Sequence, residues 1–141
     1  MKKILFTFTF LVFLVGCDLE NPGGVLTSNQ IPTSVFEFID KKNILDDENI
    51  IAYYDVSLVL NNSESAIITN KNVIYYKQDR VMKFPLNEIQ SIDNEERGII
   101  GLSIFVTSID GRIMTITIAP LNGGDLFLDL LKKEAGKNRY N

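Results

Sequence analysis

The chain has 141 residues, of which 45% are hydrophobic, and its 14 basic and 18 acidic side chains give a formal net charge of −4. It contains no histidine and one cysteine, which excludes an intrachain disulfide, a cysteine-based metal cluster and histidine-centred catalysis. A net acidic chain is also a poor partner for nucleic-acid phosphates, which need clustered Lys and Arg. The length suits one domain of ordinary size.

Residues 1–16 have the three parts of a secretory signal. Lys2 and Lys3 form a basic start, residues 4–15 form an apolar run, and Gly16 is the small residue before the expected cut. The apolar run is only about half of the roughly 20 residues that a membrane-spanning helix needs. A cleaved signal is therefore a better interpretation than a permanent transmembrane helix.

Leu14, Gly16 and Cys17 match the Leu-x-Gly-Cys motif that ends the signals of bacterial lipoproteins, so this segment resembles such a signal. The resemblance implies cleavage between Gly16 and Cys17. It also implies acylation of the Cys17 sulfur, with a fatty acid such as palmitate, and of its new amino group. Two or more acyl chains anchor a protein stably, whereas one chain holds it only marginally.

Loss of the signal would leave 12 basic and 18 acidic residues, a net charge of −6. An anionic membrane surface would repel such a domain, so the lipid rather than charge would hold it there. We expect a cell-membrane location with the domain facing the periplasm or the cell exterior. Asp18 resembles an inner-membrane retention signal, which favours the inner membrane if the organism has two membranes.

Residues 17–32 comprise the lipidated cysteine and a predicted flexible tether. The segment after Cys17 contains two prolines and a Gly-Gly pair and shows no apolar periodicity. As a coil it would have a mean reach of roughly 20 Å, which keeps the domain close to the bilayer. The folded domain is expected over residues 33–136, and residues 137–141 are expected to be a frayed tail.

A short N-terminal helix is predicted at the start of this domain. Ser34 and Glu37 have the spacing of a capping box, which would satisfy two backbone N–H groups. The predicted buried face of this helix carries Val35, Phe38 and Ile39. The acidic run Asp46–Glu48 that follows lacks the spaced oxygen ligands and the turning glycine of a calcium loop, so it is interpreted as a solvated turn.

From Ile50 onward the sequence predicts one strand after another. Runs rich in β-branched and aromatic residues alternate with turns that contain Asn, Asp or Gly. The first five predicted strands are Ile50–Leu60, Ser65–Thr69, Val73–Lys77, Arg80–Phe84 and Leu86–Asp93.

The last two predicted strands form a hairpin whose register depends on the length of its turn. A two-residue turn at Asp110-Gly111 would split the apolar residues of the two strands between opposite faces. A three-residue turn, residues 109–111, places them all on one face, and burial should select this register. The apolar residues concerned are Leu102, Ile104, Val106, Met114, Ile116 and Ile118.

An amphipathic helix is predicted at the C-terminus, over Leu126 to about Ala135. Asp125 is its expected N-cap, and Gly136 is its expected stop. Its predicted buried stripe consists of Phe127, Leu130 and Leu131.

Seven strands followed by one C-terminal helix resemble the bacterial branch of the pleckstrin-homology-like (PH-like) domains. The resemblance is carried by Ile68–Tyr76, Phe84–Ile92 and Phe127–Leu131 and covers roughly residues 48–134. It implies a mainly β (α+β) fold, in which a strongly bent, seven-stranded antiparallel sandwich or barrel is capped by the helix. Members that bind phosphoinositides carry basic residues in the first loop. Here Asn61–Glu64 has none, which leaves protein interaction as the activity that the resemblance supports.

Two tyrosine pairs, Tyr53-Tyr54 and Tyr75-Tyr76, lie on predicted strands. Strand alternation would send one tyrosine of each pair inward and the other outward. The outward tyrosines could be ordinary surface residues, or they could form an aromatic patch for a partner, since tyrosine is enriched at interfaces.

The sequence contains no nucleophile elbow and no phosphate-cradling loop, and no enzyme activity, cofactor or metal is expected. The leading hypothesis is a membrane-anchored, non-catalytic adaptor that engages an envelope protein through a sheet edge or the tyrosine patch. The alternative is lipid or small-ligand binding in the mouth of the sandwich, which a large apolar pocket would favour. An enzyme would require a cleft with two converging acids.

Overall fold

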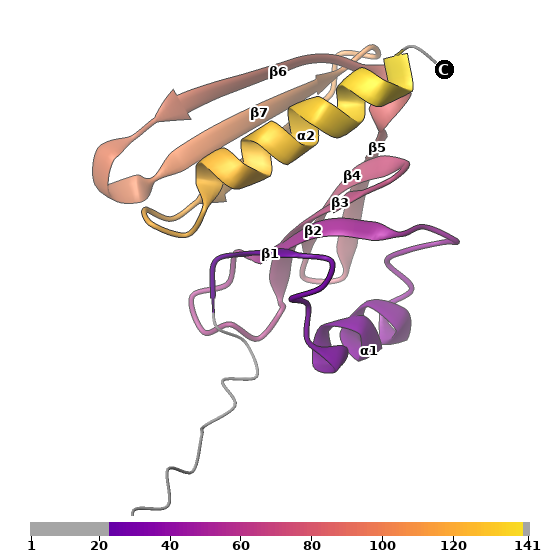
Figure 1. Ribbon diagram of the computed structural model, residues 1–141, viewed down its shortest axis with the longest axis vertical. Helices are drawn as coiled ribbons and strands as arrows, with labels where there is room; N and C mark the ends of the chain where they lie inside the picture. Colours follow the sequence, from indigo (N-terminus) through magenta and orange to yellow (C-terminus); the bar gives the residue numbers. More distant parts are fainter. Residues whose placement is uncertain (1–22, 140–141) are drawn as a thin grey trace, which may run out of the picture.

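The computed structural model describes residues 23–139, which form a mainly β protein with two antiparallel sheets and two α-helices (Figure 1). The larger sheet has the strand order β1-β2-β3-β4-β5, and the smaller has the order β6-β7-β8. The elements are β1 (Val25–Thr27), α1 (Thr33–Lys41), β2 (Ile50–Asp55), β3 (Glu64–Thr69), β4 (Asn72–Lys77), β5 (Arg80–Pro85), β6 (Ile89–Glu96), β7 (Leu102–Ser108), β8 (Ile113–Ile118) and α2 (Gly124–Arg139). Two short 3₁₀ turns, Leu86–Glu88 and Gly98–Ile100, flank β6.

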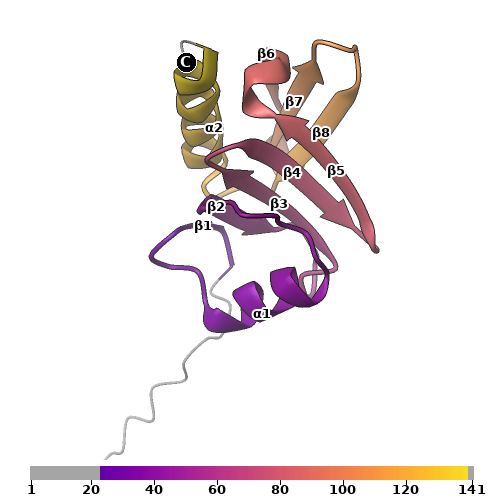
Figure 2. The same ribbon diagram turned by 90° about the vertical axis from the view of Figure 1, so that its right-hand side faces the viewer.

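The larger sheet is covered on both faces. Helix α1 packs against one face, and α2 and the smaller sheet lie on the other (Figure 2). Successive residues of a strand point to opposite faces. Tyr53 therefore joins the cluster under α1, while Tyr54 joins the cluster shared with the smaller sheet. The central strands consequently read as nearly continuous apolar runs.

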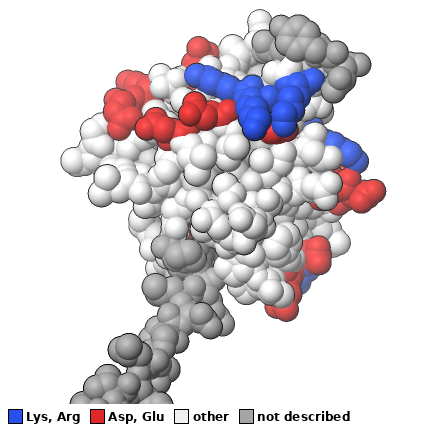
Figure 3. Space-filling model, in the orientation of Figure 1, with Lys and Arg blue, Asp and Glu red and all other residues white. Residues whose placement is uncertain are grey.

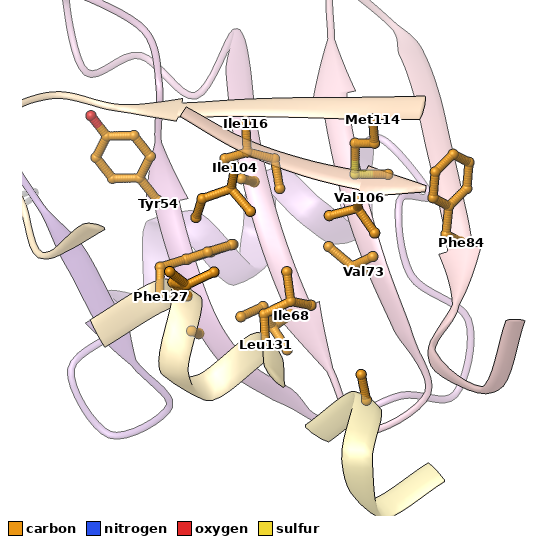
Figure 4. Packing of buried hydrophobic residues seen from close by; sticks show 14 of the residues in the cluster. Tyr54, Ile68, Val73, Phe84, Ile104, Val106, Met114, Ile116, Phe127 and Leu131 are labelled. Carbon is orange, nitrogen blue, oxygen red and sulfur yellow. The ribbon is translucent and has the colours of Figure 1, made fainter. Parts of the chain in front are cut away.

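The core between the two sheets is filled with apolar side chains. Phe127 and Leu131 of α2 point towards residues of both sheets, including Ile68 and Ile104 (Figure 4). All four of these side chains are completely buried. The apolar stripe that the sequence predicts for the C-terminal helix thus closes the space between the sheets.

The predicted register of the last hairpin is confirmed. Leu102 pairs with Ile118, and the N–H of Ser108 donates to the carbonyl of Arg112 at 2.9 Å, which leaves residues 109–111 as the turn. Gly111 occupies the left-handed region with a φ of 84°. All six predicted apolar residues of the hairpin are buried.

The mainly β fold with a C-terminal helix is also confirmed, and seven strands run from β2 to β8. Strand β1 is an addition that the sequence did not predict. It pairs with β2 through Leu26 and Tyr53, and both Leu26 and Ile31 are buried. The flexible tether expected up to Pro32 is therefore wrong for residues 23–32.

The predicted signal, the cleavage site and Cys17 lie outside the described residues. Within residues 23–139 no closed barrel forms, because the two sheets stay separate.

Several boundaries differ from the prediction for local reasons. Strand β2 ends at Asp55 rather than Leu60, because the Asp55 carboxylate accepts bonds from the N–H groups of Ser57 and Asn62, both at 2.9 Å, and so folds a loop. The N-cap of α1 is Pro32 and makes no side-chain bond, so the predicted capping box at Ser34 and Glu37 is wrong.

Helix α2 begins at Gly124 and continues to Arg139, so Asp125 lies in its first turn and Gly136 does not stop it. A glycine within a helix costs only about 1 kcal/mol relative to alanine, and packing of the apolar stripe outweighs that cost.

Candidate functional site

The tyrosine patch is not formed. Tyr53, Tyr54 and Tyr76 have relative exposures of 0%, 4% and 3%, and Tyr75 is half-buried. One tyrosine of each pair was expected to point outward. This is wrong for Tyr53-Tyr54, because both faces of the larger sheet are covered there, whereas in the second pair Tyr76 is buried and Tyr75 is half-buried. A single sequence shows the alternation of a strand but not what packs on its two faces.

Each buried tyrosine has a structural partner for its hydroxyl or its ring. The Tyr53 hydroxyl donates to Asn62 at 2.6 Å, and the Tyr54 hydroxyl accepts the N–H of Ala119 at 3.2 Å. The ring of Tyr76 packs edge-on against Phe38, with 5.4 Å between the centroids. These contacts join the loops and α1 to the sheet, which gives the tyrosines a role in packing.

The sheet edge at β5 is a feature of the described residues that is available to a partner. Strand β5 is one of the two outer strands of the larger sheet, and β1 is the other (Figure 2). Val81 and Met82 on this strand are 44% and 40% exposed. They border a surface hollow of about 280 Å³, which we call the β5 hollow and which is lined by Tyr75, Lys77, Arg80, Val81 and Met82.

The turn before β5 determines which backbone groups face outward. Gln78 and Asp79 form a two-residue turn with φ values of 46° and 64°, and Lys77 pairs with Arg80 across it. In such a hairpin the residues that flank the turn exchange both hydrogen bonds, and alternate residues then bond to the partner strand. Val81 and Lys83 therefore direct their N–H and C=O groups away from β4, towards the open edge.

One ion pair and one hydrogen bond are made to this turn. The Lys42 ammonium lies 2.6 Å from the Asp79 carboxylate, and the Tyr76 hydroxyl donates to the same carboxylate at 2.9 Å. These bonds, with that from Lys42 the strongest, lower the pKa of Asp79 below its usual range. Lys42, which follows α1, thus links that helix to the end of the hairpin that carries the β5 hollow.

Two basic residues line the β5 hollow, and among the described residues only one of them has an acidic partner. Lys77 pairs with Glu64 at 3.1 Å, and the Tyr75 hydroxyl donates to the same carboxylate. Burial, together with this carboxylate, raises the pKa of Tyr75. Arg80, in contrast, forms no ion pair with any residue from 23 to 139. The site therefore offers an apolar hollow beside an exposed guanidinium that can pair with an acid.

The inner half of β5 is joined to the start of β2 through Glu48. The Glu48 side chain is only 2% exposed, accepts the Thr69 hydroxyl and pairs with Lys83 at 3.3 Å. The expectation that Asp46–Glu48 is a fully solvated turn is therefore wrong for Glu48, although Asp46 is 86% exposed. Burial alone would raise the pKa of Glu48, but bonds from Asn72, Thr69 and Lys83 outweigh it and lower that pKa.

We expect Glu48→Gln to lower the free energy of unfolding by about 1.5–3 kcal/mol at neutral pH, because it replaces charge-assisted bonds at a buried site. Urea unfolding of the purified domain measures the change. Asp46→Asn is the matched control, since its exposed carboxylate should leave the midpoint nearly unchanged.

The stability difference between wild type and Glu48→Gln is expected to depend on pH. A carboxyl whose pKa is lowered by folding stabilises the fold above its unfolded pKa, and that contribution is lost as the pH falls through the folded pKa. The stability difference between wild type and Glu48→Gln should therefore shrink below about pH 4. A difference that stays constant down to pH 2 would contradict this role for the Glu48 charge.

The described residues can also be compared with the needs of a metal site, an internal ligand pocket and a membrane-spanning helix. Among residues 23–139 there is no group of three or more acidic, histidine or cysteine side chains that could hold a metal ion. The space between the sheets is occupied by the buried cluster around Phe127, whereas the β5 hollow is open at the surface. In the described part of the chain, no helix is long and apolar enough to cross a membrane.

Comparison with protein-family models and with curated proteins finds no match to the chain.

Proposed function

We propose that the chain is a lipid-anchored, non-catalytic adaptor with a PH-like domain, which binds an envelope protein along the outer edge of β5. The observation that carries this proposal is the open edge at Val81 and Lys83 beside the β5 hollow. Such an edge is a ready template for an added strand. The smaller sheet also has outer strands, and a hollow of about 330 Å³ lies beside β6. That hollow is lined in part by Gln90, Ser91 and Lys132, whereas exposed Val81 and Met82 make the β5 hollow more apolar.

The PH-like assignment is supported by the order of elements. Seven antiparallel strands from β2 to β8 are followed by α2, whose stripe packs between the two sheets. The lipid anchor is supported by the match of Leu14, Gly16 and Cys17 to the lipoprotein motif. A lipid anchor near the N-terminus of the chain and an open strand at the edge of its folded domain would together suit a protein that recruits a partner to the membrane.

The chemistry of the edge defines the kind of partner segment. An extended segment would exchange main-chain bonds with Val81 and Lys83 and place one apolar side chain in the β5 hollow. An acidic residue near that side chain would pair with Arg80. We therefore propose an extended, apolar segment with an acidic neighbour, supplied by a protein at the same membrane.

Photo-crosslinking in the source cell tests this proposal. A benzophenone amino acid replaces Met82 in the full chain, and the matched control carries it at Phe36, which is equally exposed at 40% but lies on α1. We expect a discrete protein adduct from position 82 that is absent from position 36. Lipid adducts alone at position 82 would instead favour lipid or small-ligand binding in the mouth of the sandwich, and equal labelling at both positions would contradict the β5 site.

We also expect Val81→Pro to weaken binding of the crosslinked segment, synthesised as a peptide, by up to about tenfold, because one strand hydrogen bond contributes about 0.5–1.5 kcal/mol. Proline is tolerated on an edge strand where its missing N–H would face outward. Titration of the peptide against wild type and variant measures the loss. Unfolding midpoints are measured in parallel, and unchanged affinity in a folded variant would contradict strand addition.

A further inference from the structure

Exposed aliphatic side chains gather in three loops and in the first turn of α2 at one end of the molecule. Leu58, Ile99 and Leu121 have relative exposures of 102%, 96% and 104%, so they make almost no contact with the fold. We call six of these side chains the aliphatic rim. It consists of Leu58, Val59, Ile99, Ile100, Leu121 and Leu126.

Contacts between the loops show that the rim belongs to a single end of the fold. A Cβ atom at Gly101 would lie 2.1 Å from the carbonyl oxygen of Ile118, so the β6–β7 loop lies against the end of β8. The N–H of Val25 donates to Asn122 at 2.8 Å, and a Cβ at Gly23 would lie 3.8 Å from Leu60. The three loops and the start of β1 lie on the left side of Figure 1.

The same end receives the chain from Cys17. Gly23 is the first described residue, and it lies six positions after Cys17 along the sequence. Even a fully extended segment of six residues spans only about 20 Å. A lipid on Cys17 would therefore hold Gly23, at the end of the fold that carries the rim, within this distance of the bilayer surface.

The composition of the rim suits the boundary between headgroups and acyl chains. Its six members are all aliphatic, and Arg97 in the β6–β7 loop is paired with Glu95 at 2.6 Å. Figure 3 shows the left flank as largely uncharged, with acidic side chains above it. Attachment here would depend on burial of apolar surface rather than on attraction between charges.

Single exposed aliphatic residues are common on protein surfaces. Five on three neighbouring loops and a sixth in the first turn of α2 form an apolar patch, and such a patch marks a site of interaction. We propose that the partner at this site is the bilayer itself, and that the rim inserts into the interfacial layer next to the Cys17 anchor. This inference rests on the proposed lipidation. It adds that the domain contacts the membrane in one orientation and does not reorient freely about its anchor.

Tryptophan fluorescence tests the inference, because the chain contains no tryptophan of its own. The lipidated full chain carries Ile99→Trp or Leu121→Trp and is reconstituted into phosphatidylcholine vesicles with and without brominated acyl chains. The matched control is Ile109→Trp, an isoleucine that is 66% exposed and lies at the opposite end of β7. Mass spectrometry of each preparation establishes whether Cys17 carries acyl chains.

We expect a blue shift and strong quenching by brominated lipid at positions 99 and 121, and neither effect at position 109. Quenching should persist at high salt, which would screen an electrostatic attachment. If the rim tryptophans are not quenched in a lipidated preparation, the inference is overturned but the proposed anchor is not. A blue shift that depends on protein concentration indicates self-association and also overturns the inference. Absence of acyl chains from Cys17 contradicts the proposed anchor, and with it the inference.

Discussion

Replacement of Phe127 by alanine is expected to lower the free energy of unfolding by about 3–5 kcal/mol. Phe127 is completely buried and belongs to the cluster that joins α2 to both sheets, so its removal leaves a cavity where three elements meet. Neighbouring side chains on the strands cannot collapse into this space without moving the helix. Urea unfolding followed by circular dichroism measures the loss.

The matched control is Leu126→Ala on the same helix. Leu126 is 43% exposed, and its truncation should cost less than about 1 kcal/mol. Similar losses for the two variants would contradict the packing of α2 between the sheets. A small loss for Phe127→Ala alone would mean that the shared core is not filled as described.

Gly101→Ala is expected to have an effect of comparable size, more than about 3 kcal/mol, or to prevent folding. Gly101 has a φ of 101°, and an added Cβ would lie 2.1 Å from the carbonyl oxygen of Ile118. Both the backbone angle and the close approach exclude a side chain at this position. Soluble yield and thermal unfolding provide the measurement.

Gly136→Ala is the control for this glycine. Gly136 lies within α2, where an added Cβ meets open space, and its φ is ordinary. Alanine should therefore stabilise the protein by about 0.5–1 kcal/mol. Equal destabilisation by both substitutions would contradict the close contact between the β6–β7 loop and β8.

The hairpin and the C-terminal helix could be predicted because each one carries its own periodicity. Burial of Leu102 and Ile118 on one face selected the register without knowledge of any other element. The stripe of Phe127 and Leu131 likewise identified the buried side of α2.

Contacts between segments distant in sequence could not be predicted. Strand β1 forms because residues 25–27 find the free edge of β2, although three residues carry too little pattern to predict a strand. Burial of Glu48 depends on Thr69 and Lys83, 21 and 35 residues away. Burial of the tyrosines depends on α1 and the smaller sheet.

The candidate site could be predicted in kind but not in position. A sheet edge was expected as the docking surface, whereas its assignment to β5 needed the strand order. The β5 hollow forms because Tyr75 and Met82 are paired on adjacent strands. The signal available in the sequence was the apolar pair Val81-Met82, which follows the two-residue turn after one intervening residue, Arg80.

Residue-resolved amide hydrogen exchange tests the central claim, an open β5 edge that accepts a partner strand, most directly. In the free protein the amides of Val81 and Lys83 should exchange much faster than those of Met82 and Phe84, which bond to β4. Binding of the segment crosslinked at position 82 should slow exchange at Val81 and Lys83 selectively. Protection of these two amides before the segment is added, or unchanged exchange once it is bound, would contradict the account.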